Sequence, residues 1–183
     1  MLRSHTCGEL SSKNLNETVT LCGWVQKSRD LGGMTFIDLR DRYGITQLVF
    51  NMEENAALCE AARKLGREFV IQAKGTVIER SSKNTNIPTG EIEVMGDTVV
   101  VLSEAAPLPF PVDSGDDTDI NEEVRLRYRY LDLRREKPAQ NLRLRSKVTS
   151  TIRRVMEDEK FLEIETPYLT RSTPEGARDF LVP

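Results

Sequence analysis

The chain has 183 residues, 38% of them hydrophobic and 30% charged, with a formal net charge of −3. This composition is typical of a globular protein that buries a core, and it leaves room for one domain and part of a second. No apolar run approaches the roughly 20 residues that span a bilayer, so we expect no membrane partner. A single histidine and scattered, odd-numbered cysteines argue against a zinc site or a His-based triad and favour reduced thiols in the cytoplasm.

The first hundred residues predict five strands and one helix. A β-branched run closes at the turn signal Leu31-Gly32-Gly33, and alternating segments follow it until a helical spacing of apolar residues appears. The expected strands cover 18–30, 34–40, 45–51, 69–80 and 91–102, and the expected helix covers 53–67 with Leu58, Ala61, Ala62 and Leu65 as its apolar stripe. Three strands, a helix and two strands is the order of the OB-fold, a barrel that binds oligonucleotides, although other small barrels also carry one helix.

One aromatic residue stands out in the second expected strand. Phe36 shares a face with the charged residues Asp38 and Arg40, so we expect it to face solvent. An exposed aromatic on a barrel strand can stack on an unpaired base, worth roughly 1–3 kcal/mol per base. The alternative is a phenylalanine packed beneath a loop, and the pattern alone leaves both open.

Polar residues on the neighbouring strands could complete a nucleic-acid site. Arg29 lies near the end of the first strand, where it could meet a phosphate or a base edge. Gln47 and Glu93 could read donors and acceptors on an unpaired base, or they could be ordinary outer-face residues.

The second half of the chain changes character. Residues 105–112 hold three prolines and predict an extended linker, and residues 124–154 are rich in Lys and Arg, which fits either a polyanion partner or a solvated helical face. We expect a helical connector, then a helix over 138–160 with Leu144, Val148, Ile152 and Val155 as its apolar stripe.

The closing segment predicts a strand that ends at Pro167, a polar loop with Glu175, and a new apolar run from Phe180. The Glu175 carboxylate could bind an ammonium group or cap a helix. An unpartnered hydrophobic segment seldom ends a domain, so we expect the chain to be the front part of a longer protein.

Four segments together resemble the bacterial type of aspartyl-tRNA synthetase, a class II aminoacyl-tRNA synthetase family. They are CGWVQKSRDLGGMTFIDLRDRYGITQLVF, TGEIEV, RLRYRYLDLRR and FLEIETPYLTRSTPEGARDFLVP. The first is shared in outline with the lysyl and asparaginyl branches, whereas RYRYLDLRR and TPEGARDFLVP point to the aspartyl branch. The resemblance covers essentially the whole chain.

The resemblance implies three successive regions with different functions along the chain. Residues 1–105 would be an OB-fold anticodon-binding domain, 106–137 a linker and basic hinge against the tRNA, and 138–183 the truncated start of an α+β class II catalytic domain with its dimer-forming first motif. The fold class would thus be mainly β, followed by the first helix and strand of that catalytic domain. The implied anticodon-binding residues are Arg29, Phe36, Gln47, Asn84 and Glu93, at positions expected to be exposed. Leu31 and Lys83 would discriminate between tRNAs, and Glu175 would bind aspartate.

The full-length relative would be a homodimer that uses ATP and Mg²⁺ to activate aspartate and then transfers it to the 3′ end of the aspartate tRNA. The second and third motifs of the class lie beyond this sequence, so we expect these residues to bind an anticodon but not to catalyse, and to hold no metal or cofactor. Two alternatives remain open: a free-standing OB-fold protein that binds single strands without sequence preference, and the lysyl or asparaginyl branch.

Overall fold

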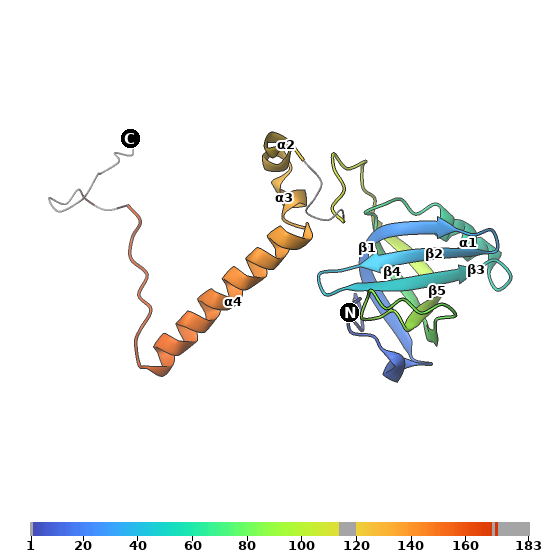
Figure 1. The fold of residues 1–183 in the computed structure, drawn as a ribbon, viewed down its shortest axis with the longest axis horizontal. Coiled ribbons are helices and arrows are strands. Elements are labelled where there is room, and N and C mark those ends of the chain that lie inside the picture. Colours follow the sequence, from blue (N-terminus) through green and yellow to red (C-terminus); the bar gives the residue numbers. More distant parts are fainter. Residues whose placement is uncertain (1, 114–119, 170, 172–183) are drawn as a thin grey trace. The chain divides into compact units, whose positions relative to one another are not determined.

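The computed structural model describes residues 2–113, 120–169 and 171 (Figure 1). The chain divides into two compact units, Met1–Asp113 and Ser114–Pro183, and each is described by itself.

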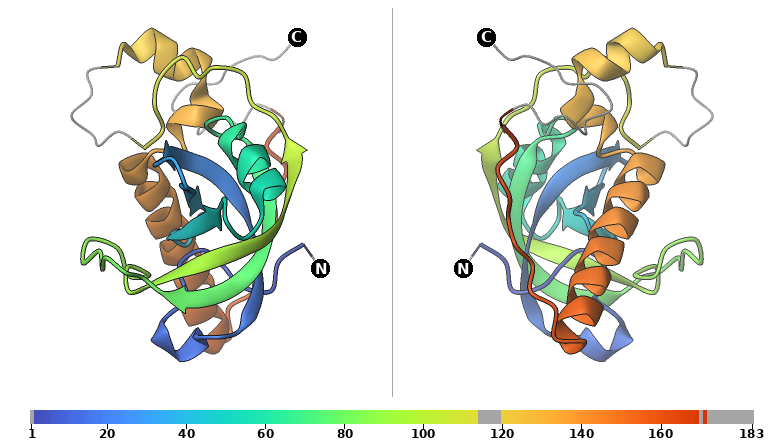
Figure 2. Two further views of the ribbon diagram at one scale, coloured as in Figure 1. Left: turned by 90° about the vertical axis from the view of Figure 1, so that its right-hand side faces the viewer. Right: turned by 90° about the vertical axis from the view of Figure 1, so that its left-hand side faces the viewer.

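The first unit is a closed five-stranded barrel. Its strands are β1 (Thr18–Asp30), β2 (Met34–Arg40), β3 (Ile45–Asn51), β4 (Val70–Glu79) and β5 (Ile92–Ser103). They pair in the order β1-β2-β3-β5-β4, and β4 returns to β1 to close the sheet. Only β3 and β5 pair in parallel among these neighbours. Strands β4 and β5 lie side by side in every view (Figure 2). The prediction of a mainly β, OB-type barrel is confirmed.

Period-two alternation in the sequence explains how the barrel fills its interior. In β2, Thr35, Ile37 and Leu39 are buried while the residues between them are more exposed, as the sequence predicts. The same alternation in β1 and β4 sends Leu21 and Ile71 inward, both with no exposed surface. Burying an aliphatic side chain of this size contributes about 1.5–3 kcal/mol, so the inward rows supply most of the stabilisation of the barrel.

Helix α1 (Ala56–Arg63) is shorter than the expected span of 53–67. It begins after Asn55, whose side-chain oxygen accepts a hydrogen bond from the Leu58 N–H at 3.0 Å, which is a typical N-cap. Cys59 and Ala62 are its buried residues. Of the predicted stripe, Leu58, Ala62 and Leu65 pack in or against the core, whereas Ala61 is exposed. The cap could not be distinguished from a further helical turn by spacing alone.

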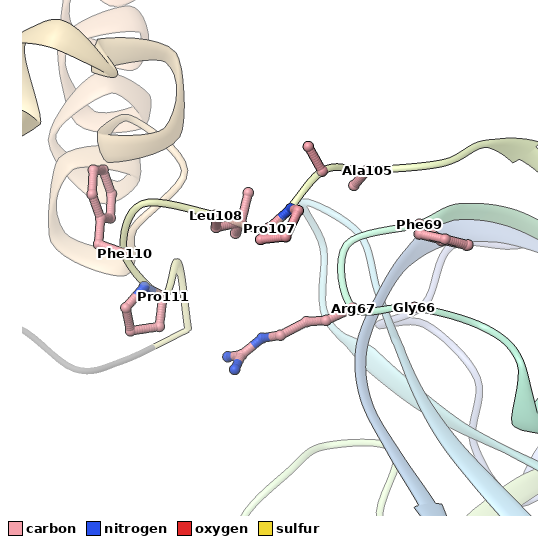
Figure 3. Close-up of a pocket in the computed structure, with 9 residues that line it drawn as sticks. Gly66, Arg67, Phe69, Ala105, Pro107, Leu108, Phe110 and Pro111 are labelled. Atoms are coloured by element: carbon pink, nitrogen blue, oxygen red, sulfur yellow. The ribbon is translucent and has the colours of Figure 1, made fainter.

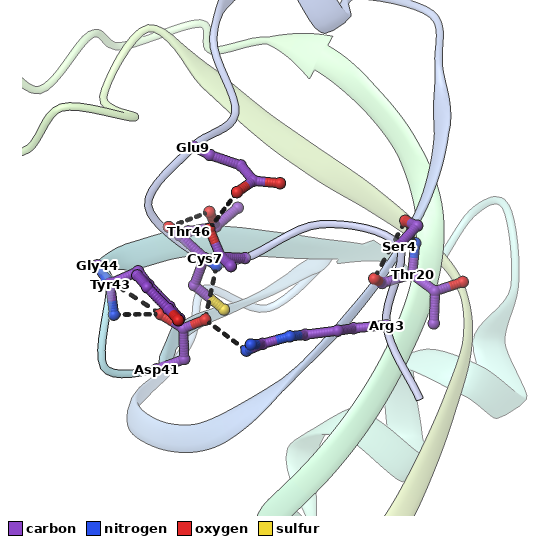
Figure 4. A network of polar contacts seen from close by, with 10 residues as sticks. Arg3, Ser4, Cys7, Glu9, Thr20, Asp41, Tyr43, Gly44 and Thr46 are labelled. Carbon is purple, nitrogen blue, oxygen red and sulfur yellow. Dashed lines mark hydrogen bonds and ion pairs between the residues drawn. The ribbon is translucent and has the colours of Figure 1, made fainter. Parts of the chain in front are cut away.

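The N-terminal segment is fastened to the barrel through one buried carboxylate. Asp41 Oδ2 accepts hydrogen bonds from the Cys7 N–H and from Nη1 of Arg3, both at 3.0 Å. Its Oδ1 accepts from the backbone N–H groups of Tyr43 and Gly44 at 2.7 and 3.1 Å, which shapes the turn between β2 and β3 (Figure 4). Asp41 therefore joins two segments far apart in sequence.

A pocket of about 530 Å³ lies where the α1–β4 connection meets the proline-rich segment. Its walls come from Gly66, Arg67 and Phe69 on one side and from residues 105–108, 110 and 111 on the other (Figure 3). Arg67 also forms an ion pair with Asp113. These contacts attach the beginning of the linker to the barrel unit.

The described part of the second unit consists of helices followed by an irregular segment. It contains α2 (Glu122–Arg127), α3 (Arg129–Asp132) and α4 (Glu136–Asp158), in agreement with the expected helical connector and long helix. The strand expected up to Pro167 is not formed, because residues 161–169 have no regular secondary structure. A strand needs hydrogen-bonding partners, and the described part of this unit contains no other strand. None of the helices in residues 2–113 and 120–169 has the length and apolar character that crossing a membrane would need.

Candidate nucleic-acid interface

The outer face of β1, β2, β3 and β5 brings the predicted barrel residues into two adjacent rows. In the first row, Arg29 pairs across strands with Phe36, and Phe36 pairs with Val49. In the second row, Asp38 pairs with Gln47, and the parallel register of β3 and β5 places Glu93 one residue before Val94, the partner of Leu48. Residues separated by more than sixty positions in the chain thus share one surface.

Gln47 is the centre of a hydrogen-bond network on this face. Its Oε1 accepts from Nη2 of Arg29 at 3.1 Å and from Nη2 of Arg80 at 2.8 Å, and its Nε2 donates to Oε2 of Glu93 at 2.6 Å. Arg29 also donates from Nη2 to Oδ1 of Asp38 at 2.6 Å. The network fixes which end of the Gln47 amide faces the arginines and which faces the carboxylate.

The expectation that Gln47 and Glu93 are exposed was wrong. Gln47 is 5% exposed and Glu93 is 7% exposed, because both point into the network rather than into solvent. Burial is tolerated here because a buried polar group costs little when it is hydrogen-bonded.

Sequence reasoning missed two members of the network, Asp38 and Arg80. Alternation along β2 could have identified Asp38, because it shares the face of Phe36. Arg80 directly follows β4, although the sequence predicted it as the last residue of the strand over 69–80. Only the closure of β4 against β5 brings it to Gln47.

Phe36 is half-buried, which lies between the two interpretations of the sequence. Its flank is the Arg29 side chain, which is 37% exposed although it is paired with Asp38. A partly exposed ring beside an accessible guanidinium can take a base by stacking while the cation meets a phosphate or a base edge.

The loop between β4 and β5 carries two further predicted residues and extends away from the strands (Figure 2). Asn84 is half-buried, and its Oδ1 accepts a hydrogen bond from the Asn86 N–H at 3.0 Å, so its side chain shapes the loop. Lys83 forms an ion pair with Glu79 at 2.9 Å, and a hydrogen bond with Glu79 raises the pKa of its ammonium group. These two contacts tie both side chains to the loop itself and to the end of β4.

Leu31 is at the tip of the β1–β2 hairpin and is 71% exposed. Its N–H donates to the Met34 carbonyl oxygen at 2.9 Å, which closes the turn. Glu175 lies outside the described residues.

The basic connector contains a buried carboxylate that pairs with its arginines. Asp132 has no exposed surface and lies 3.0 Å from Nε of Arg125, 2.5 Å from Nη1 of Arg129 and 3.5 Å from Nη1 of Arg135. Burial acts to raise the pKa of Asp132, but hydrogen bonds and charges from these arginines hold it below its ordinary value. Three arginines of the connector therefore form ion pairs within it, and these pairs help to stabilise its fold.

A metal site is not among the features of the described residues. No group of three or more His, Cys, Asp or Glu side chains comes together there in a way that could hold a metal ion.

The fold defines the first unit as an OB-fold barrel, and comparison with known families covers both units. Residues 19–102 match the family described as OB-fold nucleic acid binding domain, and residues 121–183 match tRNA synthetases class II (D, K and N). Over its whole length the chain is similar to aspartate–tRNA ligases, at 51–59% identity. It is 59% identical over 183 residues to an aspartate–tRNA ligase of Bacteroides thetaiotaomicron, and it spans 31% of the length of that relative.

Solved structures support the same fold. An asparaginyl-tRNA synthetase from Pyrococcus horikoshii superposes with a TM-score of 0.75 at 25% identity, covering 93% of this chain and 39% of that chain. An aspartyl tRNA synthetase from Entamoeba histolytica superposes with a TM-score of 0.80 at 22% identity, covering 91% and 40% of the two chains. These two structures, at 22–25% identity, support the fold, whereas the relatives that are 51–59% identical over the whole chain are aspartate–tRNA ligases.

Proposed function

We propose that the barrel binds the anticodon loop of the aspartate tRNA, and that the full-length protein is an aspartate–tRNA ligase. The observation that carries the proposal is the outer face of the barrel, where Arg29, Gln47, Arg80 and Glu93 meet in one network beside the half-buried ring of Phe36. A stacking surface next to fixed donors and acceptors suits splayed, unpaired bases.

In this proposal each predicted residue has a role. Phe36 stacks on the central anticodon base, while Arg29, Gln47, Asn84 and Glu93 recognise bases directly or by orienting one another. Leu31 and Lys83, both exposed on the barrel, help to discriminate between tRNAs. Glu175 binds the aspartate substrate. Residues 1–105 form the anticodon-binding domain, 106–137 the linker and hinge, and 138–183 the beginning of the catalytic domain.

The proposal for the full-length protein includes ATP-dependent activation of aspartate with Mg²⁺ and transfer to the tRNA 3′ end. It also includes a homodimer and a cytoplasmic location. The dimer is supported by α4, whose side chains Leu144, Val148 and Ile152 are between 48% and 63% exposed. The location is supported by Cys7, Cys22 and Cys59, all of which are free thiols.

Titration of the chain with RNA stem-loops tests the anticodon proposal. The probes are the anticodon stem-loop of the aspartate tRNA and a variant that differs only in the central anticodon base. We expect the variant to bind about tenfold more weakly, because the substituted base can still stack but leaves fixed donors and acceptors of the network unpaired, which costs roughly 1–3 kcal/mol. Equal affinity for both probes with a steep salt dependence would instead support a sequence-blind single-strand binder.

A further inference from the structure

The β1–β2 turn, residues 31–33, is attached to helix α1 by one arginine. Nε of Arg63 lies 3.2 Å from Oδ2 of Asp30 in an ion-pair contact, and its Nη2 donates a hydrogen bond to the Gly32 carbonyl oxygen. A third contact, from Nη1 to Oε1 of Glu60 at 2.5 Å, holds the guanidinium against its own helix. The Arg63 side chain is 23% exposed and that of Asp30 is 51% exposed, so the ion pair is partly open to water.

Contacts from outside the turn are needed to fix its conformation, because its two glycines allow many backbone conformations. Gly32 has a positive φ of 80°, and a Cβ at either Gly32 or Gly33 would meet nothing within 4 Å. A two-glycine turn in open space has high conformational entropy unless other groups fix it.

Three sets of contacts provide that support. Asp30 uses both of its oxygens, because Oδ1 accepts from the Gly32 N–H at 3.0 Å while Oδ2 faces Arg63. The Gly33 carbonyl oxygen accepts from the Met52 N–H at 2.9 Å, at the end of β3. Arg63 is the one side chain among these contacts that reaches the turn from outside the strands.

The turn continues directly into the candidate interface. Arg29 and Phe36 form the second cross-strand pair before it, and only the pair of Asp30 and Thr35 lies between. Displacement of the turn would therefore change the spacing and angle of the two side chains that flank the stacking surface. Leu31, at the tip, would move with it.

We propose that Arg63 is a positioning residue for anticodon binding: by tying the 31–33 turn to α1, it fixes the geometry at which Arg29 and Phe36 meet the RNA. The inference rests on the proposed function of the barrel. It assigns to α1 a part in recognition that the sequence pattern, which gives it only a core-facing stripe, does not indicate.

The test measures dissociation constants of the full chain for the aspartate anticodon stem-loop, at several salt concentrations. The variants are Arg63→Ala, Asp30→Asn, their combination and Lys64→Ala. Asn at position 30 keeps an oxygen for the Gly32 N–H but loses the charge that faces Arg63. Lys64 is the exposed neighbour in sequence, so its removal deletes the same charge without touching the turn.

We expect Arg63→Ala to bind about tenfold more weakly, with faster hydrogen exchange of the Leu31 amide and an unchanged salt slope. Lys64→Ala should bind within about twofold of the wild type, because exposed charges are screened at moderate salt. Arg63→Ala should cost much less in the Asp30→Asn background, because the contact is already weakened there. If Arg63→Ala melts below the assay temperature, Arg63→Lys, which lacks the planar fork, is measured in its place with the same expected direction.

The possible failures are distinct. Wild-type chain that does not bind the stem-loop overturns the proposed function, and the inference falls with it. Wild-type binding with an unaffected Arg63→Ala variant overturns the inference alone. A weaker variant whose salt slope falls by about one would identify Arg63 as a direct phosphate contact and would also overturn the positioning role.

Discussion

Substitution of Phe36 is the most direct test of whether the outer face of the barrel binds a base by stacking. The ring is half-buried between Arg29 and Val49, its cross-strand neighbours, so part of one ring surface remains available to a base. Removing it leaves the inward rows of the barrel intact, because Thr35 and Ile37 on either side of it are buried residues of β2.

We therefore predict that Phe36→Ala weakens stem-loop binding about tenfold or more while the barrel stays folded. Phe36→Tyr, which keeps the aromatic face, is the matched control and should bind nearly as well as the wild type. Binding is measured by titration and folding by circular dichroism. Loss of the folded signal in Phe36→Ala would show instead that the ring is a core residue.

A second residue-scale prediction concerns Asp41, whose role is structural. It is 8% exposed and accepts four hydrogen bonds, from Arg3, Cys7, Tyr43 and Gly44. Burial raises the pKa of the nearby Cys7 thiol, and the negative charge of Asp41 raises it further, so Cys7 stays protonated and serves as a packing residue.

Asp41→Ala should reduce the free energy of unfolding of the barrel by about 3 kcal/mol, because buried N–H donors lose their acceptor. Chemical denaturation followed by the fluorescence of Trp24, in the barrel, measures the change. Asp97→Ala, at an exposed position of β5, is the control and should change stability by less than about 0.5 kcal/mol. A similar small change in Asp41→Ala would contradict the role assigned to it.

At the scale of secondary-structure elements, the short helices α2 and α3 depend on one ionised carboxylate. Asp132 lies between arginines from α2, α3 and the residue before α4, so its charge links three elements. Its pKa is lowered in the folded chain, which means that the unfolded state binds a proton more readily. The stabilisation is fully present above the ordinary aspartate pKa and is lost as pH falls through the lower folded value.

We predict that the amide of Leu133, which bonds to the Arg129 carbonyl oxygen, is protected from hydrogen exchange near neutral pH and loses protection below about pH 4. Asp132→Asn should remove about 1–3 kcal/mol of that protection at neutral pH, and the difference from the wild type should shrink as the acid limit is approached. Glu123→Gln, at an exposed site in α2, is the control. A difference that is constant with pH would show that the charge of Asp132 is not what stabilises the connector.

Elements formed by local patterns could be predicted from the sequence, whereas elements that depend on cap geometry or on distant partners could not. The second strand, Met34–Arg40, was predicted with its observed bounds because alternation toward a core is a local pattern. Helix α1 was overextended because its N-cap hydrogen bond is a matter of geometry, and the strand before Pro167 was wrong because its expected partners are not in the described residues. Gln47 and Glu93 were correctly singled out as neighbours, but their burial depends on Arg29 and Arg80 and could not be seen from spacing.

At the scale of the whole molecule, α4 carries an apolar stripe that the chain leaves exposed. Leu144, Val148, Ile152 and Val155 recur at helical spacing, and each is about half-exposed or more. An apolar stripe on a long helix favours association with a partner surface, and the proposed homodimer provides one.

We predict that the chain self-associates in sedimentation velocity in a concentration-dependent way, and that the double substitution Val148→Asp with Ile152→Asp abolishes this. Two buried, unpaired carboxylates should weaken association by at least about a hundredfold. Ser150→Asp, which adds one charge to the opposite side of the same helix, is the control and should leave association unchanged. A monomeric wild type at all concentrations would argue against α4 as a dimer surface.

The sequence by itself determined the element order of the barrel, the inward faces of its strands, the amphipathic long helix and the resemblance to a synthetase family, because each of these is written in local periodicity and motif. Only the tertiary structure decided the arrangement and burial of the polar side chains on the outer face of the barrel. Barrel closure brings Arg80 and Glu93 from much later in the chain to Gln47, and α1 brings Arg63 to the β1–β2 turn. The hydrogen bonds that orient these side chains join residues separated by tens of positions, and no local pattern encodes such distances.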